Sequence, residues 1–367
     1  MTENIIDGER MDEKKKVLLA LQCVNELTNK KRAALLDLVE DPTELLETCN
    51  RQLVFKTLGD EHATEFFANL QKADALWCEL EKRDIRFITR SDDEYPEKLA
   101  DIYDAPTALF VKGNLACLKA MCVAVVGTRR PTRYGAKVAD EFSREFAKAG
   151  LTVVSGFARG VDSIAHLACV NQSKPTVAVF ASGLDVIYPA EHRSLMDGVL
   201  QSGGLIVSEY PLGTKPLQYH FPERNRIVSG LADGVFLPQA AKKSGSLITM
   251  RLAIEQGRDV FVVPGNVYDD ESAGGNELLR EMPHALVISP EDVLDQMGVR
   301  REETVQKTIE LSIVQTEILD ALHDGERHFE ELIEVTGLSV SELTSVLFDL
   351  EIEGLVFKGA GNFYSLA

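Results

Sequence analysis

Six short runs of β-branched and small apolar residues, mostly separated by segments long enough to form helices, occupy the chain from residue 121 onward. The runs are CVAVVG, LTVVSG, TVAVFASG, GLIVSEY, ADGVFLPQ and DVFVVPG. Strands that are apolar on both sides belong to parallel sheets with helices on both faces. The sequence therefore predicts an α/β fold with a Rossmann-like, doubly wound, mostly parallel sheet. In such folds ligands bind beyond the carboxyl ends of the strands.

The flanking segments differ in pattern, and 367 residues are enough for more than one core. Apolar residues recur at helical spacing from residue 14 to residue 81, which predicts a small helical domain, of the SAM/HhH-like kind, over residues 1–84. Two strands, IRFIT and ALFVKGN, then open an extended Rossmann-like domain over residues 85–290. A polar linker that includes a short helix, over 291–307, leads to three helical segments and a hairpin over 308–367, which is the winged-helix pattern.

Charge is distributed unevenly along the chain. The net charge is −19, yet residues 121–290 hold 17 basic and 17 acidic residues, whereas residues 291–367 hold 5 basic and 17 acidic ones. A polyanion is therefore expected to bind the middle of the chain. No apolar run is long enough to cross a bilayer, and the charged N-terminus lacks the apolar region of a secretion signal. These features predict a cytoplasmic protein that does not contact membranes.

The acidic tail is poorly suited to duplex DNA. Its third helical segment, SVSELTSVLFDLEIEG at 339–354, contains Glu342, Asp349, Glu351 and Glu353 and no lysine or arginine. Such a recognition helix would be repelled by phosphates. We predict a protein-binding or regulatory module here, with a stabilising appendage that has no partner as the alternative.

The first of four anion-binding turns follows the first apolar run of the middle domain. VVGTRRPTRYG places Gly127 and Thr128 at a strand end, where free backbone N–H groups and the side chains of Arg129 and Arg130 can meet an anion. The motif is neither GxxxxGK[ST] nor GxGxxG, so neither ATP nor NAD is indicated. A tight turn with surface arginines is the alternative.

The second turn, SGFARGVDSIAH, has Ser155 and Gly156 at the expected start of a helix and Arg159 near its first turn. Asp162 and His166 lie four residues apart on one helix face, which raises a catalytic alternative with Ser155 as nucleophile. The context lacks a GxSxG elbow and a third metal ligand, so a structural role is predicted for the pair and no metal site is expected.

The third turn, FPERNR, groups Phe221, Arg224, Asn225 and Arg226. An aromatic ring beside phosphate contacts offers a face for an unstacked base, which suits single-stranded nucleic acid better than a duplex. A core contact is the alternative for this phenylalanine.

The fourth turn, KKSGSLIT, places Lys243 beside Ser244, Gly245 and Ser246, where a helix can begin with bare N–H groups. Four such turns in one domain indicate a polymeric anion.

These motifs resemble the DNA-processing protein A (DprA/Smf) family. The resemblance runs from about residue 85 to residue 287 and includes GTRRPTRYG, SGFARGVDSIAH, SGLDVIYPAEH, SEYPLG, FPERNRIVSGL and KSGSLITMRLAIEQGRDVFVVPG. The four turns match the phosphate-binding turns of the family. The sequence departs from the family pattern at Gln239, where an acid is usual, and in GGNELLREMPHALV, near the expected dimer surface.

The resemblance implies a bacterial protein of natural transformation that binds and protects incoming single-stranded DNA and helps to load the RecA recombinase. It implies no catalysis and no cofactor, and a homodimer formed through the Rossmann-like domain. Two other classes remain to be weighed. A nucleotide-processing enzyme of the phosphoribohydrolase type would be expected to show PGGxGTxxE, and KKSGSLITM lacks its paired glycines and its glutamate. A protein-interaction scaffold would leave the arginine turns unexplained.

Overall fold

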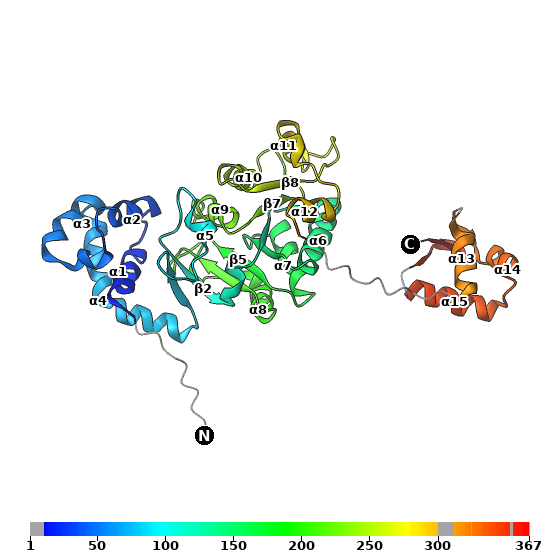
Figure 1. The fold of residues 1–367 in the computed structure, drawn as a ribbon, viewed down its shortest axis with the longest axis horizontal. Helices are drawn as coiled ribbons and strands as arrows, with labels where there is room; N and C mark the ends of the chain where they lie inside the picture. Colours follow the sequence, from blue (N-terminus) through cyan, green and yellow to red (C-terminus); the bar gives the residue numbers. More distant parts are fainter. Residues whose placement is uncertain (1–10, 300–311, 324, 353–354, 367) are drawn as a thin grey trace, which may run out of the picture. The chain divides into compact units, whose positions relative to one another are not determined.

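The structure, a computed structural model, describes residues 11–299, 312–323, 325–352 and 355–366. Two compact units divide the chain, one over residues 1–300 and the other over 301–367. The first unit holds the predicted helical and Rossmann-like segments together (Figure 1). Within the described ranges, no helix has both the length and the apolarity that a membrane crossing requires.

All eight predicted strands form and join one sheet in the order β1-β2-β6-β5-β4-β3-β7-β8. Strands β3 to β8 run parallel, and at one edge β2 pairs antiparallel with β6 and β1 pairs antiparallel with β2. This confirms the doubly wound, mostly parallel sheet. The strands are β1 (Arg86–Thr89), β2 (Ala108–Gly113), β3 (Cys122–Val125), β4 (Thr152–Ser155), β5 (Thr176–Phe180), β6 (Leu205–Ser208), β7 (Gly234–Leu237) and β8 (Asp259–Val262).

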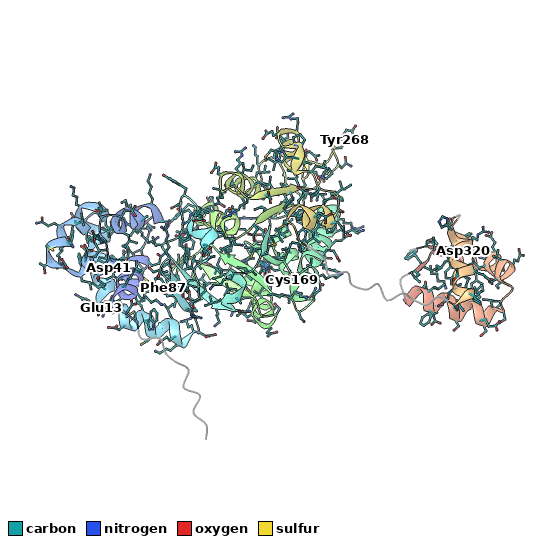
Figure 2. The ribbon with its side chains drawn as sticks, in the orientation of Figure 1. Glu13, Asp41, Phe87, Cys169, Tyr268 and Asp320 are labelled. Carbon is teal, nitrogen blue, oxygen red and sulfur yellow. The ribbon has the colours of Figure 1, made fainter. Side chains whose placement is uncertain are left out.

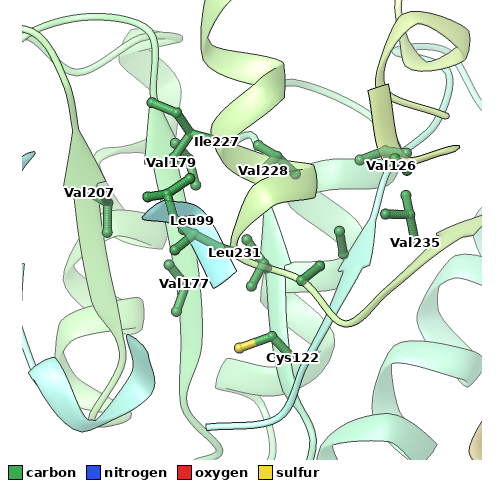
Figure 3. Packing of buried hydrophobic residues seen from close by; sticks show 14 of the residues in the cluster. Leu99, Cys122, Val126, Val177, Val179, Val207, Ile227, Val228, Leu231 and Val235 are labelled. Atoms are coloured by element: carbon green, nitrogen blue, oxygen red, sulfur yellow. The ribbon is translucent and has the colours of Figure 1, made fainter. Parts of the chain in front are cut away.

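Helices cover both faces of this sheet, because successive strand residues point to opposite sides. Val123 and Val125 of β3 share a core with α6, α7 and α12, whereas Ala124 between them shares one with α9 and α10. Figure 3 shows the second layer, in which Ile227 and Val228 of α9 pack over the sheet. The helices are α6 (Arg133–Lys148), α7 (Val161–Val170), α8 (Arg193–Gln201), α9 (His220–Gly230), α10 (Ser246–Glu255), α11 (Ala273–Glu281) and α12 (Pro290–Gln296).

The N-terminal segment is helical, as predicted, and has a core of its own that includes Leu21, Leu35 and Phe66. It also packs on the sheet, because Leu19 of α1 belongs to the same buried cluster as Phe87 of β1, which is labelled in Figure 2. The predicted boundary at residue 84 falls in the turn between α4 and β1. The main helices are α1 (Glu13–Gln22), α2 (Asn29–Leu36), α3 (Arg51–Leu58) and α4 (Asp60–Lys82).

The segment predicted as a linker, 291–307, begins inside the first unit. Ser289 caps α12 through the backbone N–H of Asp292, and Pro290 occupies the first helical position. Val293 and Leu294 of this helix are buried in the core beside β3. The packed helix therefore extends the sheet domain beyond residue 290, and residues 300–307 lie outside the described residues.

The second unit has the winged-helix pattern expected from the sequence. Its core joins all three helices to the strands through Leu322, Leu332, Leu347 and Tyr364. A short strand, β9, which was not predicted from the sequence, pairs with β11 and makes the hairpin a three-stranded sheet. The elements are α13 (Ile313–His323), α14 (Phe329–Thr336), α15 (Val340–Ile352), β9 (Arg327–His328), β10 (Val356–Lys358) and β11 (Phe363–Leu366).

The third helix of this unit, α15, presents no cation to solvent. Glu342 and Asp349 are exposed on it, together with the apolar ring of Phe348. Glu353, which was predicted to belong to this helix, lies outside the described residues.

Candidate nucleic-acid interface

The turns after β3 and β4, helix α9 and the segment that enters α10 surround a cavity of about 710 Å³. The cavity lies where the strand order reverses, because β3 leads into α6 on one face of the sheet and β7 leads toward α10 on the other (Figure 1). This is the position at which doubly wound sheets bind their ligands.

Most of the predicted site residues meet in this cavity. Ser155, Arg159 and Arg226 are not among the residues that line it. The predicted residues that do line it are Gly127, Thr128, Arg129, Arg130, Gly156, Phe221, Arg224, Asn225, Lys243, Ser244, Gly245 and Ser246.

The turn after β3 corrects one expectation, since neither donor of Thr128 is free. Its backbone N–H donates to the carbonyl of Gln239 at 2.9 Å, and its hydroxyl donates to Oε2 of Glu271 at 2.8 Å. A side chain at Gly127 would lie 2.6 Å from Cγ2 of Val161, so this turn packs too closely for any other residue. The anion-binding capacity of the turn therefore rests on Arg129 and Arg130, which are both exposed.

Gln239 itself is buried and joins the β3 turn to the segment after β8. Its Oε1 accepts from the backbone N–H of Thr132 at 2.9 Å, and its Nε2 donates to Oδ2 of Asp269 at 3.0 Å. An amide can supply both the acceptor and the donor, whereas an ionised acid would face Asp269 with like charge. The departure from the family pattern at Gln239 is thus accommodated by a local network.

The turn after β4 also differs from the prediction, because α7 begins only at Val161. Ser155 is fully buried, and its hydroxyl donates to the carbonyl of Val125 at 2.6 Å. Arg159 is exposed and forms a surface ion pair with Glu191. Of the three residues predicted here, only Gly156 reaches the cavity.

Arg224 lines the cavity but is a buried structural side chain rather than a free phosphate ligand. It is 3% exposed, and its Nη1 donates to the carbonyls of Gly156 and, at 2.6 Å, Val179. A Cβ at Gly156 would overlap the guanidinium, which explains the glycine.

The charge of Arg224 is balanced by a buried acid. Burial lowers the pKa of Arg224 to about 10, and Asp162 opposes that shift. Burial likewise raises the pKa of Asp162 above its usual range, and Arg224 counteracts this. Each group thus supports the ionised form of the other.

Arg226 points away from the cavity. Its guanidinium pairs with Glu209 at 2.6 Å and with Asp104 at 3.2 Å, and both members of the pair with Glu209 are buried. Burial would lower the pKa of Arg226, but these carboxylates raise it above the usual value. The FPERNR cluster is therefore divided between two faces of α9.

The fourth turn begins a helix as predicted. Gly245 is the N-cap residue of α10 and Ser246 its first residue, with the hydroxyls of Ser244 and Ser246 2.8 Å apart. A Cβ at Gly245 would meet no atom within 4 Å, so the helix N-terminus is open to the cavity. Lys243 is exposed beside it. The sequence predicted bare N–H groups here, but those of Leu247 and Ile248 donate to the carbonyls of Ser244 and Gly245 at 3.2 and 3.1 Å, and that of Ser246 donates to Oγ of Ser244 at 3.4 Å. This end of α10 therefore offers the positive end of the helix dipole, hydroxyls and a cation.

Several cavity residues were not predicted as site residues from the sequence. Tyr188 and Gln218 line the cavity from loops that carry no basic cluster, and Glu271 contributes a carboxylate beside that of Asp162, for which only a structural role was predicted. Tyr188 lies in SGLDVIYPAEH, a motif that was noted only for its family resemblance. Within the described ranges, no group of three or more His, Cys, Asp or Glu side chains is placed to hold a metal ion.

His166 has the structural role that was predicted, but its partner is not Asp162. Its Nδ1 lies 2.8 Å from the hydroxyl of Thr176, while Asp162 accepts from the backbone N–H of Ala158 at 3.2 Å. Burial lowers the pKa of His166 to about 3.

This low pKa predicts a pH-dependent loss of stability. Below about pH 6.5 the imidazole of His166 is protonated in the unfolded chain but stays neutral in the folded state. The free energy of unfolding should therefore decrease as the pH is lowered from about 6.5 to about 3, by up to about 1.4 kcal/mol per pH unit. Urea titrations at several pH values should show a shallower decline for His166→Gln than for the wild type. Parallel pH profiles would contradict the assignment.

Comparison with known proteins places the chain in a family. The family model for DNA recombination-mediator protein A matches residues 86–298, and that for the DprA winged helix domain matches residues 302–362. Protein Smf of Escherichia coli K12 is 36% identical over 298 residues, which is 79% of each chain. DNA processing protein DprA of Streptococcus pneumoniae is 46% identical over 203 residues, which is 55% of this chain and 71% of that protein.

Two solved structures are similar to the chain. The X-ray structure of DprA from Streptococcus pneumoniae has a TM-score of 0.66 at 37% identity and covers 78% of this chain and 98% of that one. A structure of DNA processing protein A from Helicobacter pylori, which concerns the single-stranded DNA binding mode of that protein, has a TM-score of 0.52 at 32% identity and covers 58% and 95%. With two matching family models and these relatives, the chain belongs to the DprA/Smf family of DNA-processing proteins.

Proposed function

We propose that the chain binds single-stranded DNA in the cavity at the carboxyl ends of β3, β4 and β7. The observation that carries this proposal is that one cavity joins three exposed cations, Arg129, Arg130 and Lys243, to the open N-terminus of α10. The same cavity is lined by an aromatic pair, the rings of Phe221 and Tyr188. Cations with a helix N-terminus suit phosphates, and aromatic rings suit unstacked bases. The relative from Helicobacter pylori binds single-stranded DNA, which supports the same ligand here.

The residues of the proposed site differ in role. Arg129, Arg130 and Lys243 bind phosphates directly, and Ser244, Gly245 and Ser246 contribute hydroxyls and the helix N-terminus. Gly127, Thr128 and Gly156 shape the turns, Asn225 adds a polar group, and Phe221 belongs to the aromatic pair. Arg224 holds the β4 turn in place, whereas Ser155, Arg159 and Arg226 act outside the cavity.

The wider role that we propose is that of a recombination mediator without catalytic activity. In this role the protein protects incoming single-stranded DNA during natural transformation, helps to load RecA onto it in the cytoplasm, and acts as a homodimer formed through the Rossmann-like domain. Membership of the DNA recombination-mediator protein A family supports this role. The acidic surface of α15 supports protein binding rather than duplex recognition by the second unit.

The salt dependence of binding tests the proposed site. Three phosphate contacts to a single strand give a slope of about −2 in a plot of log affinity against log salt, so affinity should fall about 20-fold between about 50 and about 200 mM salt. Fluorescence anisotropy with labelled oligonucleotides measures this. Alanine at Arg129, Arg130 or Lys243 should lower the slope by about 0.7 each.

A matched control is available in Arg159→Ala, which removes an exposed arginine outside the cavity. This variant should keep the wild-type slope. Flat affinity across the salt range, or an equal effect of Arg159→Ala, would contradict the proposed site. A nucleoside-monophosphate hydrolysis assay on the same protein tests the enzyme alternative, and turnover that responds to Asp162→Asn would favour it.

A further inference from the structure

The aromatic pair of the cavity is not symmetric. The guanidinium of Arg129 lies over the ring of Phe221 at 5.2 Å from its centroid, and the ring of Tyr188 meets that of Phe221 at 5.7 Å with an interplanar angle of 62°. Phe221 is half-buried, whereas Tyr188 is 43% exposed. A base that stacked on the face of Phe221 nearest Arg129 would have to displace the cation.

The contact between Arg129 and Phe221 restricts the position of the guanidinium. A guanidinium held over a ring keeps its N–H donors in its plane, where they stay available for a phosphate. Arg129 has no ion pair or hydrogen bond to another side chain among the described residues, so the ring of Phe221 restricts an otherwise mobile cation. Restricting a long side chain before binding reduces the entropy lost on binding.

Tyr188 has the properties that a stacking residue needs. It lies in the loop between β5 and α8, at the carboxyl end of a strand adjacent to β4, and it lines the same cavity as the exposed cations. An edge-to-face contact with Phe221 holds the Tyr188 ring on one side, while about two-fifths of Tyr188 remains exposed to solvent. Rigid aromatic rings provide stacking area at low entropic cost.

We propose that Tyr188 provides the stacking face for an unpaired base, and that Phe221 is a positioning residue that acts by holding Arg129. This rests on the proposed function, because it assigns a base and a phosphate of the same bound strand to two neighbouring parts of the cavity. Tyr188 therefore contributes to binding by stacking on a base, and Phe221 contributes by holding a cation that binds a phosphate. Substitutions at the two rings should have different effects on base stacking and on salt dependence.

The test compares Tyr188→Leu with Tyr188→Phe, since leucine keeps an apolar side chain but removes the aromatic face. Tyr188→Leu should weaken single-stranded DNA binding by about 5- to 150-fold. Its salt slope should stay that of the wild type, because no phosphate contact is lost. Tyr188→Phe should bind like the wild type. Fluorescence of 2-aminopurine in the oligonucleotide should be quenched by the wild type and Tyr188→Phe and not by Tyr188→Leu.

Phe221→Leu provides the matched comparison. It should retain the quenching but lower the salt slope toward that of Arg129→Ala, and the double variant Phe221→Leu/Arg129→Ala should bind like Arg129→Ala alone. Quenching that persists in Tyr188→Leu and disappears in Phe221→Leu would overturn the assignment of roles. Loss of salt dependence in the wild type itself would instead contradict the proposed function. Thermal melting of each variant separates unfolding from loss of binding.

Discussion

Arg224→Ala is expected to lower the free energy of unfolding by about 3–5 kcal/mol, although the residue lines the cavity. The substitution leaves the buried carboxylate of Asp162 without its balancing charge and removes the donor from the carbonyls of Gly156 and Val179. Urea denaturation measures the loss of stability. Affinity for single-stranded DNA should also fall, because the β4 turn loses its support.

Arg129→Ala is the matched control for this prediction. Arg129 is exposed and contacts a ring rather than buried carbonyls, so its loss should leave the stability near that of the wild type while lowering both affinity and salt slope. The opposite pattern, with a stable Arg224→Ala that loses one phosphate contact, would show that Arg224 binds DNA directly.

Arg226→Met should destabilise the fold by a similar amount, about 3–5 kcal/mol, because it leaves Glu209 buried without its ion-pair partner. The substitution should also weaken the attachment of the N-terminal helices. Nε2 of Gln22 donates to the carbonyl of Glu209 at 2.6 Å, and Nδ2 of Asn29 donates to Oδ1 of Asp104 at 2.7 Å. This network connects α1 and α2 to the face of α9 that lies away from the cavity.

The salt slope of DNA binding separates this structural role from a phosphate contact. Arg226→Met should keep the wild-type slope under conditions in which it remains folded, since the guanidinium faces away from the cavity. The double variant Arg226→Met/Glu209→Gln should regain part of the lost stability, because the unpaired buried charge is gone. A slope reduced by about 0.7 would return Arg226 to the DNA site.

Much of the fold could be predicted because its signals are local. Apolar β-branched runs indicated the six parallel strands, the segments IRFIT and ALFVKGN indicated the two edge strands, and helical spacing indicated the helices of both flanking segments. Ser244, Gly245 and Ser246 likewise identified the start of α10, since small and hydroxyl residues are typical of helix N-termini. Strand β9 was missed because two residues carry no periodicity.

The faces of α9 show where sequence adjacency misled. Residues 224 and 226 are neighbours in the sequence, but two positions on a helix are about 200° apart, so they point to opposite sides. Phe221, Arg224 and Asn225 follow the spacing of one helix face and all line the cavity, while Arg226 does not. This division follows from helical geometry once the segment is recognised as a helix.

The sequence by itself determined the elements, the helix N-terminus at Gly245 and the absence of a net negative charge in the middle of the chain, because propensity, capping and charge are properties of nearby residues. Only the tertiary structure decided which cations remain available to an anion. Arg224 donates to the carbonyls of Gly156, just after β4, and of Val179 in β5. Arg226 pairs with Glu209 and Asp104, and both donors of Thr128 bind acceptors in distant segments. These partners lie far away in sequence, and burial against them depends on how the layers pack, which no local pattern encodes.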